Sequence, residues 1–144
     1  MVDVAAKAVT QRTATARSIV SLPPEVLAHL SEGGIDSKKG PVFQTAIIAG
    51  IMAAKKTGDL IPLCHPLGLD NCKITLSIDD GNDVVIDCTA SITAKTGVEM
   101  EALVGASIAA LTVYDMCKAM SHDIVIKETK LMSKTGGKRE FKRA

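Results

Sequence analysis

Residues 72–92 read CKITLSIDDGNDVVIDCTASI, and this stretch decides the fold. Apolar and polar residues alternate in 72–79 and again in 84–92, so each run turns one apolar face toward a core. Between the two runs, Asp80-Gly81-Asn82-Asp83 has the composition of a tight turn. The stretch therefore predicts two antiparallel strands joined as a β-hairpin.

Helical and loop signals precede the hairpin. Residues 42–56 are predicted to form a buried helix, because 46–53 is apolar nearly all round. A first helix is expected over 23–33, with prolines at its start and glycines at its end. Two closely spaced prolines forbid regular helix in 59–67, which we expect to be a shaped loop.

A long helix is predicted after the hairpin. Thr96 and Glu99 match a capping box, and we expect the helix to continue to about Met120. Residues 102–113 carry no charge, which predicts burial of this helix against a sheet and another helix or subunit. A last strand is expected near 124–130.

The two ends of the chain look less regular. Residues 1–17 are polar and Ala-rich, and we expect an extended, partly mobile arm followed by a short strand at 18–22. Residues 133–144 form a basic tail, either a solvated mobile end or an anion-binding segment. The whole pattern predicts one α+β domain over 1–144, with helices packed on one face of an antiparallel sheet.

Composition bounds the function. The net charge is +1 and only three residues are aromatic, so nothing favours a nucleic-acid or membrane partner. The four cysteines form no CxxC motif and the histidines are scattered, so we expect free thiols and no transition metal. We find no secretory signal and no apolar run of about 20 residues, and expect a cytoplasmic protein. The excess of aliphatic residues favours contacts between subunits.

Polar residues within apolar segments are the candidate functional groups. His65 lies between Cys64 and Pro66 in the constrained loop. It is either a packed loop histidine with one hydrogen bond or a general acid/base near neutral pH. A Cys–His nucleophile pair is a weaker alternative, because adjacent side chains rarely point at each other.

Asp115 and Lys118 are three residues apart near the end of the long helix and so lie on one face. They form either a surface ion pair of little energetic consequence or a semi-buried pair suited to proton transfer. Their neighbours, which include Val113 and Met116, are not typical of a surface. They favour the semi-buried pair, and spacing alone leaves both alternatives open.

Glu99 and Glu101 stand at the start of the same helix. Glu99 has a structural explanation as the capping-box acid, and Glu101 has none. Glu101 and Asp115 lie within about 40° around the helix but about 21 Å apart along it. If both serve one ligand, the two helix ends must come from different chains, which predicts a site at a subunit interface.

Two segments have the glycines and lysines of phosphate-handling loops: 39–41 and 134–138. A flexible loop is the alternative for both. Together with the acids, they favour a phosphorylated small substrate without naming one.

The sequence resembles the molybdenum cofactor biosynthesis protein C family, the cyclic pyranopterin monophosphate synthases. The resemblance rests on blocks in the family's order along the whole chain. They are Met1-Val2-Asp3-Val4 with Lys7, Lys39-Gly40-Pro41-Val42-Phe43 through Ala49-Gly50-Ile51, Asp59-Leu60-Ile61-Pro62-Leu63-Cys64-His65-Pro66-Leu67, Lys95-Thr96-Gly97-Val98-Glu99-Met100-Glu101-Ala102-Leu103, Tyr114-Asp115-Met116-Cys117-Lys118-Ala119 and Lys134-Thr135-Gly136-Gly137-Lys138. The Leu-Cys-His-Pro-Leu and Gly-Val-Glu-Met-Glu-Ala blocks are the most specific.

The resemblance implies a ferredoxin-like fold, a homohexamer built as a trimer of dimers, and a site at a subunit boundary. It implies conversion of 3′,8-cyclo-7,8-dihydro-GTP to cyclic pyranopterin monophosphate and pyrophosphate. We expect no cofactor, and a role for Mg²⁺ stays open. The catalytic residues it implies are Asp115, Lys118, His65 and Lys39. The substrate-binding residues it implies are Leu63, Cys64, His65, Met100, Glu101, Glu99, Arg12 and Lys134.

Two other functions remain as alternatives. The chain could be a non-catalytic module that binds nucleotide phosphates, or a structural oligomer whose charged residues form interface salt bridges. Assay of pyrophosphate release separates an enzyme from the first alternative.

Overall fold

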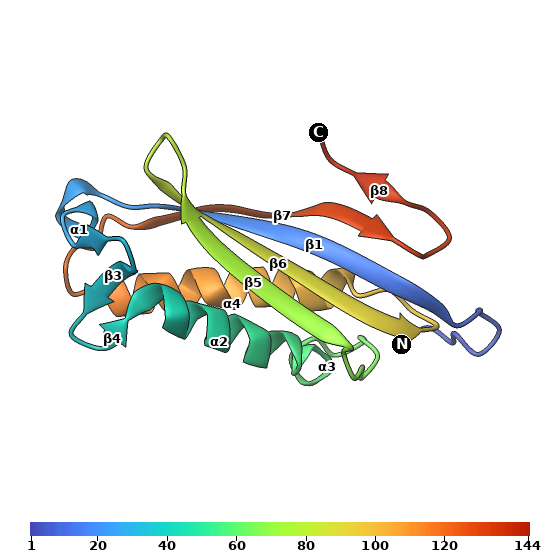
Figure 1. Cartoon of the computed structure of the whole chain (residues 1–144). Helices are drawn as coiled ribbons and strands as arrows, with labels where there is room; N and C mark the ends of the chain where they lie inside the picture. Colours follow the sequence, from blue (N-terminus) through green and yellow to red (C-terminus); the bar gives the residue numbers. More distant parts are fainter.

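The computed structural model describes residues 1–144 and is dominated by a five-stranded antiparallel sheet of order β5-β6-β1-β7-β8. Its strands are β1 (Thr10–Ser21), β5 (Asn71–Ile78), β6 (Asp83–Ala94), β7 (Val125–Thr135) and β8 (Phe141–Lys142). Helices α2 (Val42–Ala54) and α4 (Glu99–Cys117) cover one face of this sheet (Figure 1). The predicted ferredoxin-like α+β fold with helices on one face is confirmed.

The remaining elements are short. They are α1 (Pro24–Leu27), β2 (Leu30–Ser31), β3 (Gly34–Ser37), β4 (Gly40–Pro41) and α3 (Thr57–Leu60). Strands β2, β3 and β4 form a separate three-stranded sheet, which lies beside the C-terminal end of α4 (Figure 1). The N-terminus and α3 lie toward the opposite end of α4. These short elements therefore close the two ends of the helical layer.

The predicted hairpin is present as β5 and β6. Leu76 pairs with Ile86, and Ile74 pairs with Cys88. Both pairs face the helices, and Ile74, Ile86 and Cys88 belong to the buried core. The alternation of polar and apolar residues therefore placed these strands correctly.

The expectation of a mobile arm over 1–17 is wrong for its second half. Strand β1 begins at Thr10 and lies between β6 and β7, at the centre of the sheet. Its inward residues include Ala14, Ala16 and Ser18, which are buried although they are small. A strand with such residues has a weak hydrophobic pattern, which is why it resembles a polar arm.

Other element boundaries also differ. The first helix is a single turn ending at Leu27, because Gly33 and the following residues belong to the β2–β3 hairpin. No side-chain cap precedes α4, so the predicted capping box of Thr96 and Glu99 does not form. The basic tail over 133–144 is not a free end. Strand β7 runs through it to Thr135, and β8 pairs back on β7.

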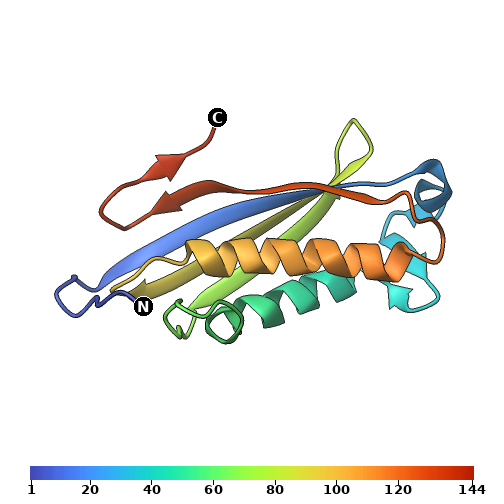
Figure 2. The same ribbon diagram turned by 180° about the vertical axis from the view of Figure 1, so that it is seen from behind.

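The buried core contains no aromatic residue, and its two helices approach each other closely. A Cβ on Gly50 of α2 would lie 2.7 Å from the carbonyl oxygen of Gly105 in α4, so the two backbones are in contact there. Helix α4 is long and apolar enough to cross a membrane by length and composition, contrary to our reading of the sequence. Its place along the sheet and α2 (Figure 2) accounts for that composition as a core helix.

Candidate functional site

The candidate residues gather at opposite ends of α4. Lys39 and Lys118 lie with Asp115 near its C-terminal end, and the other candidates lie toward its N-terminal end. Glu101 and Asp115 are both within α4, so about 21 Å of helix separates them. Figure 2 shows α4 running as one uninterrupted helix between these two regions. A single chain therefore divides the candidate residues into separate groups.

The first group is the lysine–carboxylate cluster of Lys39, Asp115 and Lys118. Lys39 Nζ donates to Asp115 Oδ2 at 2.8 Å, and Lys118 Nζ lies 3.1 Å from Asp115 Oδ1. Lys39 is brought there by the turn between β3 and β4. The Asp115 side chain is 52% exposed, so the expectation of a semi-buried pair is wrong for the isolated chain. Val113 and Met116 are buried because they face the core side of the helix.

Both lysines act on the Asp115 carboxyl. The hydrogen bond from Lys39 and then that from Lys118 hold the pKa of Asp115 below its ordinary value. Asp115 is therefore a carboxylate at neutral pH, with a cation at each oxygen. Such an arrangement holds opposite charges within reach of one small ligand.

The second group is the glutamate pocket, a cavity of about 150 Å³ at the N-terminal end of α4. It brings together two segments that the sequence indicated separately, the proline-rich loop and the first turn of the helix. Its lining residues are Leu63, Cys64, His65, Leu67, Thr96, Gly97, Glu99, Met100 and Glu101. All the substrate-binding candidates except Arg12 and Lys134 line this cavity.

The acids of the glutamate pocket differ in environment. Glu101 is only 3% exposed, and burial raises the pKa of its carboxyl. Glu99 is a third exposed, and its Oε1 lies 3.2 Å from Lys134 Nζ of β7. Burial and the charge of Glu101 raise the pKa of the Cys64 thiol, which argues against a thiolate nucleophile there.

His65 makes one hydrogen bond, between Nε2 and the backbone oxygen of Val2 at 2.7 Å. This contact fits the structural interpretation of His65 and leaves Nδ1 for another partner. The thiol of Cys64 is not its partner. The structure thus keeps acid/base chemistry open for His65 and gives no support to a Cys–His pair.

Arg12 lies in a third place, the basic pocket, a cavity of about 300 Å³ near the ends of β1 and β7. It is lined by Lys7, Ala8, Thr10, Arg12, Gly136, Gly137 and Lys138. The turn is built by glycine: Gly136 has φ +85°, and a Cβ there would collide with the carbonyl oxygen of Gln11. Backbone and three cationic side chains thus surround a space suited to an anion.

Sequence reasoning gave Lys7 no role, and it placed Lys138 only within the candidate phosphate-handling segment 134–138. Only the packing of the two chain ends places both lysines beside Arg12. No group of three or more His, Cys, Asp or Glu side chains converges on a point that could hold a metal ion.

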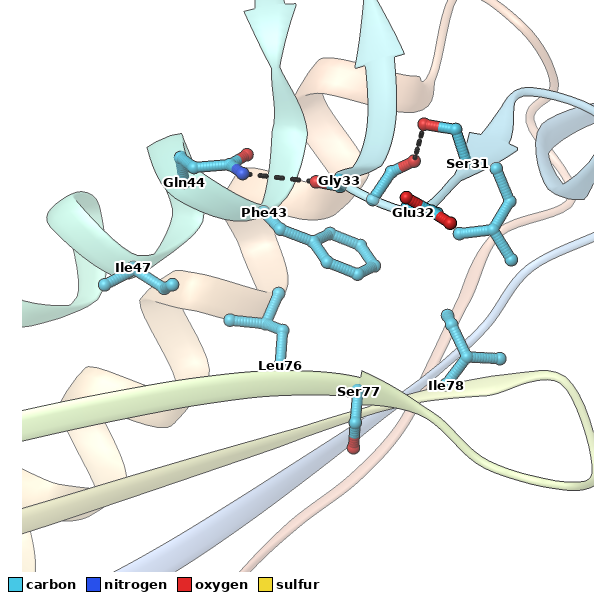
Figure 3. Close-up of a pocket in the computed structure, with 11 residues that line it drawn as sticks. Ser31, Glu32, Gly33, Phe43, Gln44, Ile47, Leu76, Ser77 and Ile78 are labelled. Atoms are coloured by element: carbon cyan, nitrogen blue, oxygen red, sulfur yellow. Dashed lines mark hydrogen bonds between the residues drawn. The ribbon is translucent and has the colours of Figure 1, made fainter.

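A larger cavity of about 450 Å³ contains none of the candidate residues. Figure 3 shows the Phe43 ring in this cavity, between the β2–β3 hairpin and the side chains of Leu76 and Ile78 from β5. Its only ionisable side chain is Glu32. The cavity therefore has one carboxylate and no cationic side chain to bind a phosphate.

Comparison with known proteins gives consistent matches. The model of the MoaC family matches residues 1–137. A cyclic pyranopterin monophosphate synthase of Xanthomonas axonopodis pv. citri is 55% identical over 98% of this chain and 86% of its own length. The synthase of Brevibacillus brevis is 54% identical over 96% of this chain and 85% of its own length. Molybdenum cofactor biosynthesis protein 1 of Dictyostelium discoideum is 53% identical over 96% of this chain, which spans only 24% of that protein.

Proposed function

Because the chain belongs to the MoaC family, we propose that it is a cyclic pyranopterin monophosphate synthase, a lyase-type enzyme of molybdenum cofactor biosynthesis. The observation that carries the proposal is the Asp115 carboxylate held between Lys39 and Lys118. A surface ion pair needs one cation. Two cations on one carboxylate, at the end of a helix whose other end carries a buried glutamate, favour proton transfer.

The substrate we propose is 3′,8-cyclo-7,8-dihydro-GTP, with cyclic pyranopterin monophosphate and pyrophosphate as products. Attack of a sugar hydroxyl on the α-phosphorus forms the cyclic phosphate and expels pyrophosphate. The departing charge needs cations, which Lys39, Lys134 and Arg12 supply. The basic pocket adds Lys7 and Lys138 to this set.

Rebuilding the guanine-derived ring needs groups that give and take protons. Burial favours the protonated form of Glu101, which suits it to donate. Asp115 is ionised, which suits it to accept a proton or to stabilise the charged form of a neighbouring lysine. His65 and Lys118 complete the proposed acid/base set, and Leu63, Cys64 and Met100 shape the wall of the glutamate pocket.

We propose further that each site takes residues from two chains. A ligand pocket ordinarily measures about 300–1,000 Å³. The glutamate pocket, at about 150 Å³, is too small for a nucleotide-derived triphosphate, and the lysine–carboxylate cluster is half exposed. Packing of neighbouring chains in a hexamer, a trimer of dimers, would enclose both groups around one ligand. A cytoplasmic location belongs to the same proposal.

The test is turnover of the proposed substrate. The purified chain is incubated with 3′,8-cyclo-7,8-dihydro-GTP, with and without Mg²⁺, and pyrophosphate and the pterin product are quantified by chromatography. We expect equal amounts of both products. Tight binding without either product would instead establish the non-catalytic phosphate-binding module. If Lys39→Ala and Lys134→Ala change the assembly but not ligand binding, the structural oligomer is the correct function.

A further inference from the structure

Two cysteines outside the proposed site are in contact. Cys72 lies on β5 and Cys88 on β6, and their Sγ atoms are 3.7 Å apart. In the register of these strands Cys72 pairs with Ala90 and Ile74 with Cys88, so the cysteines are diagonal neighbours on the same face. All four cysteines are free thiols, and no contact joins Cys64 or Cys117 to another thiol.

The two thiols have different surroundings. Cys88 is fully buried, and a Cβ on Gly105 of α4 would lie 2.6 Å from its Sγ, so the helix holds this sulfur in place. Cys72 is half-buried and belongs to β5, the edge strand of the sheet. A reagent from solvent therefore meets Cys72 first.

The contact also polarises the pair. The contact with the Cys88 thiol lowers the pKa of Cys72, whereas the contact with Cys72 together with burial raises the pKa of Cys88. The thiolate is the nucleophilic form of cysteine. The more accessible sulfur is thus also the more reactive one, and the buried sulfur keeps its proton.

We propose that Cys72 and Cys88 form a reversible dithiol–disulfide pair, which a hydroperoxide oxidises. The Cys72 thiolate attacks one oxygen of hydrogen peroxide, the O–O bond breaks, and hydroxide leaves as Cys72 becomes a sulfenic acid. The Cys88 sulfur then attacks Sγ of Cys72, and the S–O bond breaks as the thiol proton leaves with hydroxide as water. Overall, two thiols lose two electrons and two protons, and one peroxide becomes two waters. A small dithiol such as dithiothreitol reverses the change.

The fold explains why this disulfide should be reversible. Diagonal Cα atoms are ordinarily about 7–8 Å apart, whereas disulfides usually span about 4.4–6.8 Å. Strand β5 must therefore move toward Cys88 by roughly an ångström, which an edge strand with one hydrogen-bonded neighbour permits. Mildly strained disulfides are the ones that reducing systems reopen.

The experiment treats the full chain with one equivalent of hydrogen peroxide, quenches with catalase, and counts thiols after denaturation. We expect the four free thiols to fall to two, and to return with dithiothreitol. A tryptic map is made in a Cys64→Ala background, because residues 57–73 otherwise carry two cysteines in one peptide. It should show 57–73 joined to 74–95 within one chain. Amide hydrogen exchange in Asn71–Ile78 should slow at least about tenfold on oxidation.

Two variants test the order of attack. Cys88→Ala should accumulate a Cys72 sulfenic acid that a cyclic 1,3-diketone traps, whereas Cys72→Ser should give neither trapped sulfenic acid nor disulfide. The proposal is overturned if four thiols persist under peroxide, if the cross-link joins two chains or another cysteine, or if Cys72→Ser still loses two thiols.

Discussion

Lys134 Nζ lies 3.2 Å from Glu99 Oε1, and this contact ties the end of β7 to the first turn of α4. The Glu99 carboxylate forms an ion pair with Lys134, which is distant in sequence, and it does not cap its own helix. As a result, the glutamate pocket and the basic end of β7 belong to one end of the molecule. The lysine–carboxylate cluster lies at the other end of α4.

Removing any member of the lysine–carboxylate cluster should lower turnover strongly without unfolding the chain. Lys39→Ala, Asp115→Asn and Lys118→Ala should each lower kcat by about 10²-fold or more, the usual contribution of acid/base groups. Far-UV circular dichroism should be unchanged because these side chains are half exposed. Lys38→Ala is the matched control, since Lys38 is an exposed neighbour without an ion pair and should retain activity. Full activity of Asp115→Asn would refute the assignment.

The pKa of Asp115 should rise when either lysine is removed. Lys39 contributes the largest lowering and Lys118 the next, so Lys39→Ala should raise this pKa more than Lys118→Ala does. Carbon-13 NMR titration of the Asp115 carboxyl measures both shifts. If ionised Asp115 is required, the acid limb of the rate profile should move to higher pH in the same order. An unchanged titration in both variants would show that the lysines do not hold the carboxylate in solution.

Glu101 should make stability fall as pH rises. Its pKa is raised in the folded chain by burial, so its contribution is fully present below the unfolded pKa and is lost as pH rises through the folded pKa. Glu101→Gln removes this term, and its stability relative to wild type should therefore improve from pH 4 toward pH 8. Urea unfolding at a series of pH values measures the difference. A pH-independent difference would mean that Glu101 is solvated.

Adding one methyl group where the helices cross should destabilise the fold. In Gly105→Ala the new Cβ meets Cys88 Sγ at 2.6 Å and the Gly50 carbonyl oxygen at 3.3 Å. Overpacking of this kind costs about 1–3 kcal/mol in the free energy of unfolding. Cys88→Ala should recover part of that loss in the double variant. Gly33→Ala serves as the control, because nothing lies within 4 Å of its added Cβ.

Two inactive variants should restore each other if the site joins two chains. Asp115→Asn lacks the lysine–carboxylate cluster, and Glu101→Gln lacks the buried acid. Co-refolded at equal concentration, they should regain about a quarter of wild-type activity, because about one site in four then takes its cluster from one variant and its glutamate from the other. Each variant refolded alone should stay inactive. No recovery, with mixed oligomers demonstrated by mass spectrometry, would refute a shared site that takes these two groups from different chains.

The parts of the fold that could be predicted are those with large side chains in a regular pattern. Ile74, Leu76 and Ile86 identify the hairpin, and an apolar stretch identifies α2. Most of strand β1 was not predicted, because Ala14 and Ala16 differ little in hydrophobicity from their threonine neighbours. Buried and less buried residues nevertheless alternate along it with a period of two. Propensity and pattern are local signals, whereas the central place of β1 depends on pairing with β6 and β7.

The candidate site shows the same limit. The spacing along α4 correctly indicated that Glu101 and Asp115 cannot meet within one chain. The partners of these acids could not be derived from spacing, because Lys39 and Lys134 reach them from distant segments. Asp115 is more exposed than its sequence neighbours suggest, because the apolar neighbours Val113 and Met116 lie on the other side of the helix.

Because one continuous helix, α4, separates the two groups, an insertion or deletion within it changes their relative position. One inserted residue would move the far group by about 1.5 Å and swing it by about 100° around the axis. Residues 79–82 of the β5–β6 turn, by contrast, are exposed and belong to neither group, so this turn should tolerate added residues. Natural variation and engineered insertions should therefore accumulate in the hairpin tip and be absent from the span between Glu101 and Asp115.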